Sequence, residues 1–590
     1  MSIAPEEKTI PLEQIRYSDS EMGATELKHR HPDQNSQPAD PVAKYASIFK
    51  RNKRPYPGFR KNFYKYFAEY SNNTGIHGFK YMGDPNMTVA ERLWWFALFC
   101  VSLYICINLI IQTYIKWDTA PVLVSFARSP TPVWQVPFPA ITVCSETKAR
   151  QRAYNFTEYY HRMQSAENNM TEDELKKFAD LALVCESHLF NKGKKTTNYD
   201  TIEFLMGIAP QFDEMLWSCK HNLINGSCAD FFTPILTEEG LCYTFNMLDR
   251  SELLKENVYT HGDYMSHDKK SDGWNLENGY PPGASLETYP RRALSAGFNS
   301  GFLLLLRAYE TDLDFICRGP VQGFKILLHN PAETPRVSLQ YFRAPLNQEV
   351  VVAIKPDMMT TSENLKSYEP HMRQCYFPTE RNLAFFQTYT QQNCEIECLT
   401  NYTLKKCGCV SYYMPHEKGT PICGSGNIIC AFHANGEIRT EAIKLSDQEK
   451  KDSSPDCDCL PSCTSLVYNA ETSQADFMWQ KWFQALKRNV TEPDLMISKV
   501  SIFFKEQQFI TSERNELYGR VDFLANCGGI LGLFLGFSFL SIVEVLYFLS
   551  LKLICNVKKY GPHYWSGSPD LLNDDSYIHK HDNKNGNQNT

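Results

Sequence analysis

Two apolar stretches, far apart in the sequence, most constrain how this chain of 590 residues can fold. The first, residues 93–115, holds 23 residues without a charged side chain and would extend about 35 Å as a helix. The second, residues 523–551, contains one charged residue, Glu544. Each is long enough to cross the hydrocarbon core of a bilayer, which is about 30 Å thick. The sequence therefore predicts a membrane protein with two spanning helices and one large central region.

The ends of the first stretch are typical of a membrane span. Trp94 and Trp95 stand at one end, and Tyr114 and Trp117 stand at the other. Amphipathic aromatic rings favour the two membrane–water interfaces, so this belt indicates a true span. The stretch follows a long charged segment, which excludes a cleavable signal peptide as its explanation.

Basic residues predict the orientation of the two spans. A run before the first span contains no acid, and three lysines follow the second span. Positive charge is retained on the cytoplasmic side, which places both termini inside and the central region outside. The run before the first span also suits an anionic inner leaflet, so we expect a membrane-lipid contact there. These residues are Lys44, Lys50, Arg51, Lys53, Arg54, Arg60, Lys61 and Lys65, and then Lys552, Lys558 and Lys559.

These observations predict five segments. Residues 1–92 form a cytoplasmic tail, residues 93–115 the first span, residues 116–520 an extracellular domain, residues 521–551 the second span, and residues 552–590 a second cytoplasmic tail. We expect a multi-pass protein of the plasma membrane.

Cysteine and asparagine usage agrees with an extracellular central domain. Sixteen of the 20 cysteines lie between Cys144 and Cys463, an even number that is typical of a disulfide framework. Five glycosylation sequences lie in the same region, at Asn155, Asn169, Asn225, Asn401 and Asn489. Asn72 and Asn86 also fit the motif, but on the inner side they would stay unmodified.

The second apolar stretch is unusual for a passive anchor. Gly528, Gly532 and Gly536 recur every four residues, although each glycine costs a helix about 1 kcal/mol relative to alanine. Such a face lets another backbone approach closely. Ser538, Ser541 and Glu544 recur every three residues and would form a polar fan of roughly 120° on a helix. An ionisable group at membrane depth is expected to face a pathway, although Glu544 could instead reach the interface beside Lys552 in a simple anchor helix.

These residues resemble a known family. The sequence GLFLGFSFLSIVEVLYF, residues 532–548, resembles the second span of the degenerin/epithelial sodium channel family. Residues 513–529, ERNELYGRVDFLANCGG, resemble the segment before the pore in the insect pickpocket branch. The resemblance implies a selectivity filter at Gly536, Phe537 and Ser538, with Ser541 and Glu544 lining the pore. Phe537 departs from the family pattern, which has a small residue at this position.

The same resemblance implies three gating residues. Ala525 matches the degenerin position at the outer mouth of the pore. His77 and Gly78, in GIHGFKYM, match a cytoplasmic His-Gly motif of the family. A lone His-Gly pair is also common in ordinary turns, so the family context carries this assignment.

The central region has no internal repeat and is predicted to be one disulfide-rich α+β domain. Thr171 and Glu174 form a capping-box signature for a helix that leads toward Cys185. Ser473 and Asp476 predict a second helix, which reaches about Arg488. Residues 324–329 and residues 497–504 predict strands, and the second of these leads almost directly into the second span. Residues 263–282, which are rich in Gly, Asp and Pro, predict an exposed loop.

Cysteine spacing between residues 375 and 463 predicts a ladder. Cys394 and Cys398 share a helix face about 6 Å apart, and Cys457 and Cys459 share a strand face at about 6.6 Å. The closely similar rises predict the pairs Cys394–Cys459 and Cys398–Cys457. Cys407 and Cys409 would then pair outward to Cys430 and Cys423. A zinc site is the alternative for the Cys-x-Cys sequences, with His416 nearby.

The ladder also resembles the thumb domain of acid-sensing channels, and further segments match the base of that family's extracellular domain. These segments are FPAITVC at residues 138–144 and GLCYTFN at residues 240–246. The resemblance implies the pairs Cys144–Cys242, Cys219–Cys228 and Cys375–Cys463. Cys185 and Cys317 are then paired by elimination only.

Two spans cannot enclose a pore, so several chains must assemble. The resemblance implies a homotrimer or a heterotrimer with family subunits that conducts Na⁺ in sensory or epithelial cells and binds an amiloride-like blocker. Glu544 favours cations over anions, no cofactor is expected beyond the permeant Na⁺, and the net charge of −7 favours no nucleic acid.

The sequence is also compatible with other functions. A two-pass surface enzyme is one alternative, but the central region has none of the common hydrolase or nucleotide-binding motifs. A receptor, or an auxiliary subunit that does not conduct alone, is another. Channels gated by extracellular ATP share the topology, but the cysteine ladder and the Gly-Phe-Ser sequence argue against them. What opens such a channel, and whether it assembles with itself or with relatives, does not follow from the sequence.

Overall fold

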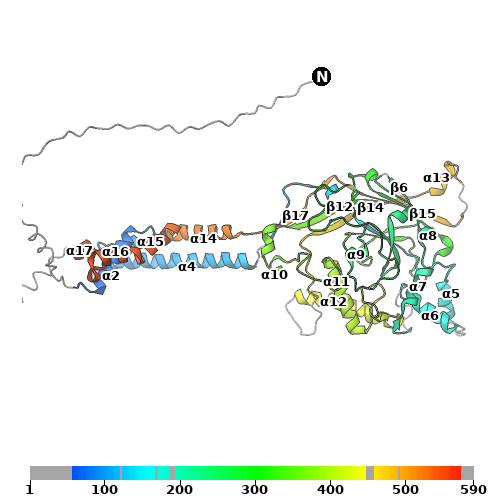
Figure 1. Cartoon of the computed structure of the whole chain (residues 1–590), viewed down its shortest axis with the longest axis horizontal. Helices are drawn as coiled ribbons and strands as arrows, with labels where there is room; N and C mark the ends of the chain where they lie inside the picture. The colour runs from blue at the N-terminus through cyan, green and yellow to red at the C-terminus, as the bar shows by residue number, and fades with distance from the viewer. Residues whose placement is uncertain are drawn as a thin grey trace, which may run out of the picture. The chain divides into compact units, whose positions relative to one another are not determined.

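The computed structural model describes most of the chain, in two compact units (Figure 1). The terminal unit contains described residues up to Leu98 and from Phe539 onward, and the central unit contains those from Phe99 to Ser538. The described residues are 56–119, 122–165, 170–185, 193–222, 224–285, 287–446, 457–488 and 492–572.

Two helical segments are long and apolar enough to cross a membrane. Helix α4 (Val89–Thr119) has 31 residues, a mean hydropathy of 2.1 in its most apolar window, and contains the whole predicted first span. The second candidate is Phe539–Tyr560, with a mean hydropathy of 1.8. It comprises helices α15 (Phe539–Leu549) and α16 (Leu551–Tyr560). Two candidate spans fit a protein that crosses the membrane twice.

The predicted second span, residues 521–551, is not one helix. It begins in helix α14 (Arg520–Leu535), which ends before α15 starts at Phe539. The 16 residues of α14 extend about 24 Å, which is less than the hydrocarbon core of a bilayer. The continuous helical candidate for the second span, Phe539–Tyr560, therefore starts later than the predicted residues 521–551.

An eight-stranded sheet forms one half of the central fold. Its order is β1-β17-β12-β15-β9-β5-β6, and β14 also pairs with β12. Strand β12 runs parallel to β15 and β17, and its other pairings in this sheet are antiparallel. The strands are β1 (Val122–Phe126), β5 (Leu216–His221), β6 (Ile224–Gly226), β9 (Phe302–Tyr309), β12 (Gln348–Thr361), β14 (Ser465–Asp476), β15 (Leu495–Phe504) and β17 (Ser512–Glu516).

A five-stranded antiparallel sheet packs against it, in the order β11-β10-β3-β8-β7. Strand β10 is the predicted strand at residues 324–329, and every residue of β10 and β3 is buried. One hydrophobic cluster contains side chains of both sheets, and the rings of Phe245 and Phe302 lie 4.4 Å apart within it. The strands are β3 (Ala140–Ser145), β7 (Phe232–Thr237), β8 (Gly240–Phe245), β10 (Phe324–His329) and β11 (Phe342–Ala344).

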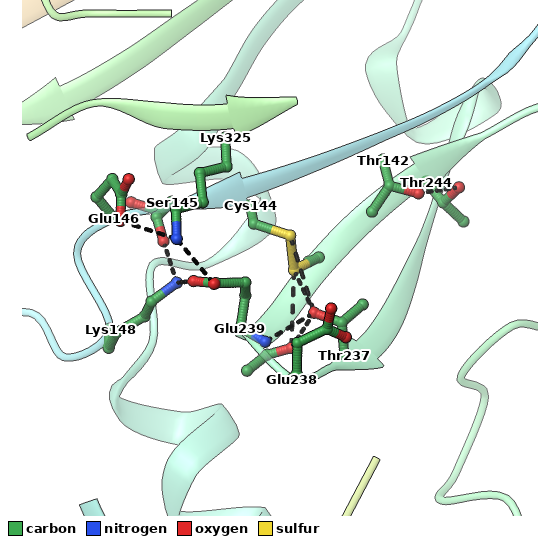
Figure 2. The surroundings of a disulfide bond; sticks show 12 residues. Thr142, Cys144, Ser145, Glu146, Lys148, Thr237, Glu238, Glu239, Thr244 and Lys325 are labelled. Carbon is green, nitrogen blue, oxygen red and sulfur yellow. Dashed lines mark hydrogen bonds and ion pairs between the residues drawn. A yellow bond between two sulfur atoms is a disulfide. The ribbon is translucent and has the colours of Figure 1, made fainter. Parts of the chain in front are cut away.

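The Cys144–Cys242 disulfide joins β3 to β8 inside this sheet, and a group of charged side chains lies beside it (Figure 2). Lys148 Nζ lies 2.7 Å from a Glu239 carboxylate oxygen, and Lys325 Nζ lies 2.8 Å from the other oxygen. Arg318 also pairs with Glu239. Burying this carboxylate is therefore compensated by three cations.

The structure confirms one predicted helix start and corrects the other. The amide N–H of Thr171 donates to the Glu174 carboxylate at 2.8 Å, so the capping box opens helix α6 (Glu172–Leu181) as predicted. Ser473 and Asp476 instead lie in strand β14, which pairs with β12 over twelve consecutive residues. The helix begins only at α13 (Trp479–Ala485). Pairing in the sheet overrides the local capping pattern.

Two further expectations need correction. The predicted loop 263–282 is irregular, but Trp274 and Leu276 within it are buried in the core. Strand β15 does not lead directly into the second span, because the two-residue strand β16 (Gln508–Phe509) and then β17 intervene.

Eight disulfides bridge the central unit, and their partners are those that the sequence analysis assigned. Helix α11 (Gln391–Cys407) contributes Cys394 and Cys398. The segment with Cys457 and Cys459 is not a strand, because Asp458 between them has a φ of 42°. The pairs are Cys144–Cys242, Cys185–Cys317, Cys219–Cys228, Cys375–Cys463, Cys394–Cys459, Cys398–Cys457, Cys407–Cys430 and Cys409–Cys423.

Glycosylation remains a prediction. Asn401 is exposed on α11, and Asn155 caps helix α5 (Phe156–Gln164) by accepting the Glu158 N–H at 3.0 Å. Asn225 lies in β6. Asn169 and Asn489 lie outside the described residues, as do the basic residues from Lys44 to Arg54.

Candidate ion pathway and gating residues

The predicted selectivity filter coincides with a break in helical structure. Helix α14 ends at Leu535, and Gly536 takes the left-handed conformation with φ 64° and ψ 21°. The N–H groups of Gly536 and Phe537 still donate back to Gly532 O and Leu531 O, at 2.9 and 3.3 Å. A residue with a Cβ is strained at this φ, so the turn favours glycine.

Such a break supplies polar backbone within an apolar segment. The last four carbonyl groups of a helix have no partner within that helix. Carbonyl oxygens that line a pathway can replace part of a cation's hydration shell. Residues 536–538 lie between two helices, so their backbone is outside the continuous hydrogen-bond series of α14 and α15.

The polar fan expected on one helix is divided by this break. Ser541 and Glu544 share helix α15, whereas Ser538 precedes its first residue. Ser541 is buried and Glu544 is half-buried in the chain. The spacing of three residues therefore places two of the three side chains on a common helix face, and Ser538 belongs to the turn.

The glycine face of α14 is open within one chain. A Cβ built on Gly528 or Gly532 meets no atom within 4 Å. The space that these glycines leave is therefore not used by contacts inside the described chain, as expected for a face that packs against another backbone.

Ala525 lies in the second turn of α14, two residues after Phe523, whose ring is held by Trp117. The Trp117 indole donates to Tyr518 O at 3.1 Å and stacks on Phe523 with ring centroids 5.2 Å apart. The start of α14 is thus fastened to the end of α4, and Ala525 is exposed on the helix that follows.

Helices α4 and α14 are each connected to a strand of the central domain, and these two strands pair with each other. Strand β1 follows α4 and β17 precedes α14, and the two strands pair from Val122↔Glu516 to Phe126↔Ser512. Sequence patterns did not reveal this ladder, because its strands lie about 390 residues apart and are only partly buried.

His77 and Gly78 lie in the terminal unit, between helix α2 (Phe59–Asn73) and helix α3 (Phe79–Gly83). Gly78 has a φ of 84°, a conformation that favours glycine, and His77 is exposed. In α3, Tyr81 stacks on Trp95 of α4 at 4.4 Å. The motif therefore forms a turn that is held against the start of the first span.

The terminal unit also joins the N-terminal helix to the end of the second span. The Tyr66 hydroxyl donates to Phe548 O at 2.5 Å, and Lys552 Nζ lies 2.5 Å from a Glu69 carboxylate oxygen. Lys552 also lies over the Phe548 ring at 4.3 Å. Sequence analysis missed these contacts, since no local pattern links residues that are more than 480 positions apart.

Comparison with known protein families matches residues 70–548 to the family described as amiloride-sensitive sodium channel. The chain belongs to this family. Its relatives in the family include Pickpocket protein 28 of Drosophila melanogaster, which is 28% identical over 504 residues that cover 82% of this chain and 78% of that protein. Sodium channel protein Nach of the same species is 23% identical, over 85% of this chain and 90% of that protein. Acid-sensing ion channel 1C of Danio rerio is 22% identical, over 81% of this chain and 82% of that protein.

Membership of the amiloride-sensitive sodium channel family confirms the resemblance and the assignment to the pickpocket branch. It identifies the chain as a subunit of a cation channel and not as an enzyme. The family needs no cofactor, and the described residues contain no cluster of metal-binding side chains.

Proposed function

We propose that this chain is a subunit of a sodium-selective, amiloride-sensitive channel that admits Na⁺ passively across the plasma membrane of sensory or epithelial cells. Both termini are cytoplasmic in this proposal, and the disulfide-rich domain is extracellular. The single observation that carries it is the turn at Gly536, which interrupts an apolar segment of a family member at the predicted filter.

The selectivity filter in this proposal is formed by Gly536, Phe537 and Ser538, and Ser541 and Glu544 line the pathway next to it. Backbone carbonyls and serine hydroxyls coordinate the ion, and Glu544 favours cations. Three chains, identical or related, surround the pathway. The open glycine face of α14 supports close packing between neighbouring chains.

The orientation can be tested separately from conduction. Asn155 and Asn401 should carry glycans removable by an endoglycosidase, whereas Asn72 and Asn86 should not. Glycans on Asn72 or Asn86 would reverse the proposed topology.

Conduction is tested with two glycine variants. Gly536→Ala places a Cβ on a left-handed residue, whereas Gly529→Ala adds one to a helical residue with nothing within 4 Å. In voltage-clamped oocytes with mixed Na⁺ and K⁺ solutions, wild type and Gly529→Ala should share a reversal potential near that of Na⁺ and be blocked by amiloride. Gly536→Ala should lose current or shift the reversal potential toward that of K⁺.

A silent chain on its own would leave the auxiliary-subunit alternative, so it should then be expressed with a conducting relative. If Gly536→Ala changes the reversal potential of the mixed channel, this chain lines the pathway. An unchanged potential, with both chains at the cell surface, would contradict the proposal.

A further inference from the structure

A cavity of about 80 Å³ lies in the disulfide-rich domain. Six separate parts of the chain meet around it: helix α7 (Tyr199–Ile208), strand β7, the irregular segment 254–265, Thr334, Phe386, and residues 412–416. No sequence pattern links these segments.

The cavity has an apolar lining without charge. Its walls include Ile202, Leu236, Leu254, Val258, Phe386 and Met414. No lysine, arginine, aspartate or glutamate is among the residues that line it. An ion would have no partner of opposite charge in such a cavity, and burying it would be costly.

Polar atoms in the same lining have no partners. Four lining residues carry a buried polar atom without a hydrogen bond among the described residues. Buried polar groups are normally hydrogen-bonded, so four such atoms around one cavity indicate a missing partner. The atoms are Tyr412 Oη, His416 Nε2, Thr334 Oγ1 and His261 Nδ1.

The chemistry of two of these atoms can be assigned. His416 Nδ1 lies 2.7 Å from Met414 O, and a carbonyl only accepts, so Nδ1 carries the proton and Nε2 is an acceptor. Burial lowers the pKa of His416, which keeps the ring neutral. Burial also raises the pKa of Tyr412 well above its usual value, so its hydroxyl remains a donor. Both side chains are at least nine-tenths buried.

We propose that this cavity binds a small uncharged organic molecule, or the end of one, that carries an amide or hydroxyl group on a short apolar part. The polar group donates to His416 Nε2 and accepts from Tyr412, and the apolar part contacts the aliphatic walls. An engineered apolar cavity of about 150 Å³ holds benzene, so 80 Å³ suits a group of about four or five non-hydrogen atoms.

The proposal concerns the disulfide-rich domain and does not depend on whether the chain conducts ions. The occupant is distinguished from water alone by its apolar part, because a water molecule would leave the aliphatic walls without contacts.

The test uses the full chain in lipid nanodiscs, with propionamide as the probe and propionate and propylammonium as charged molecules of similar size. Saturation-transfer NMR should detect propionamide at millimolar concentration, with a signal at least fivefold stronger than that of either ion. Val258→Phe fills the cavity from a partly exposed position and should abolish the signal.

Adjacent tyrosines provide the matched control. Tyr412→Phe removes the unpartnered hydroxyl and should weaken propionamide binding at least fivefold. Tyr413→Phe also alters the lining, but the Tyr413 hydroxyl is not among the buried polar atoms without a partner, so this variant should bind like wild type.

Three results would overturn the proposal. One is equal binding of propionamide and the two ions. Another is an unchanged signal in Tyr412→Phe and Val258→Phe when both variants elute as folded protein. The third is the absence of any propionamide signal in wild type, which would leave water as the occupant.

Discussion

The ammonium group of Lys148 lies 2.7 Å from the Glu239 carboxylate, and both side chains are almost completely buried. Burial alone would raise the pKa of Glu239, but Lys148, Arg318 and Lys325 together hold it well below its usual range. Burial lowers the pKa of Lys148 to about 8, and Glu239 partly offsets this effect. The pair is thus ionised at neutral pH only because each partner compensates the other.

Removing one partner should therefore destabilise the domain. Lys148→Met leaves Glu239 with two of its three cations, and breaking a buried pair costs about 3 kcal/mol. The free energy of unfolding, measured by denaturant titration, should fall by this amount. Lys177→Met breaks the exposed pair Lys177–Asp173, also 2.7 Å long, and should change it little. If both substitutions lowered the free energy of unfolding equally, burial of the Lys148–Glu239 pair would not explain its contribution to stability.

Acid should weaken the domain through His329. Burial lowers the pKa of His329 to about 4, against about 6.5 when unfolded. Its Nδ1 lies 3.0 Å from Asn330 O and its Nε2 lies 2.9 Å from Thr142 Oγ1. The folded state holds His329 neutral, and this stabilisation is fully present above pH 6.5 and is lost as the pH falls through 4. The free energy of unfolding should therefore fall by about 2–3 kcal/mol between pH 7 and pH 4.5.

His329→Gln should remove this part of the acid sensitivity, measured as the difference in unfolding free energy between pH 7 and 4.5. The exposed His371 provides the control, because His371→Gln should leave the difference as in wild type. An unaltered pH dependence in His329→Gln would rule out this residue as a cause.

Ala525→Val should open the channel without a stimulus. A larger side chain on α14, immediately after the Trp117–Phe523 stack, is expected to push apart helices that converge at the pore mouth. The measurement is steady, amiloride-sensitive current at normal surface expression. Leu524→Met conserves volume at the preceding exposed position and should stay closed. A silent Ala525→Val channel would show that this is not the gating position.

Phe537 should support the filter without lining it. Three phenyl rings that point into a narrow pathway would dehydrate it, so we expect the ring to pack outward against neighbouring helices. Phe537→Ala should lower the surface level and leave the ratio of Na⁺ to K⁺ permeability near wild type. Phe539→Ala removes a ring that is 77% exposed and should change neither the surface level nor the permeability ratio. A strongly shifted reversal potential with higher unitary conductance in Phe537→Ala would place the ring in the pore.

Local patterns predicted the parts of the fold that depend on neighbouring residues. The capping box at Thr171 formed as expected, since its atoms lie within one helical turn. Cysteine spacing suggested the partners of Cys394 and Cys398, because a helix fixes the rise between them.

Long-range contacts were not predictable in this way. Ser473 lies in a strand because twelve residues of β14 pair with β12, which outweighs a local cap. Lys148 and Glu239 are 91 positions apart, and nothing in their flanking sequence links them. At the candidate filter, the sequence indicated the residues, but only the φ of Gly536 revealed that the helix stops there.

The β1–β17 ladder limits how α4 and α14 can move where they enter the domain. Its five residue pairs leave no room for gradual sliding, because strands exchange hydrogen bonds only in steps of two residues, about 6.6 Å. A smaller axial shift of one helix against the other would break the ladder without forming a new one. Tilting and twisting of the two helices as one body keep the ladder intact, so we expect movements of this end of the domain to reach the helices as rotations and not as axial shifts.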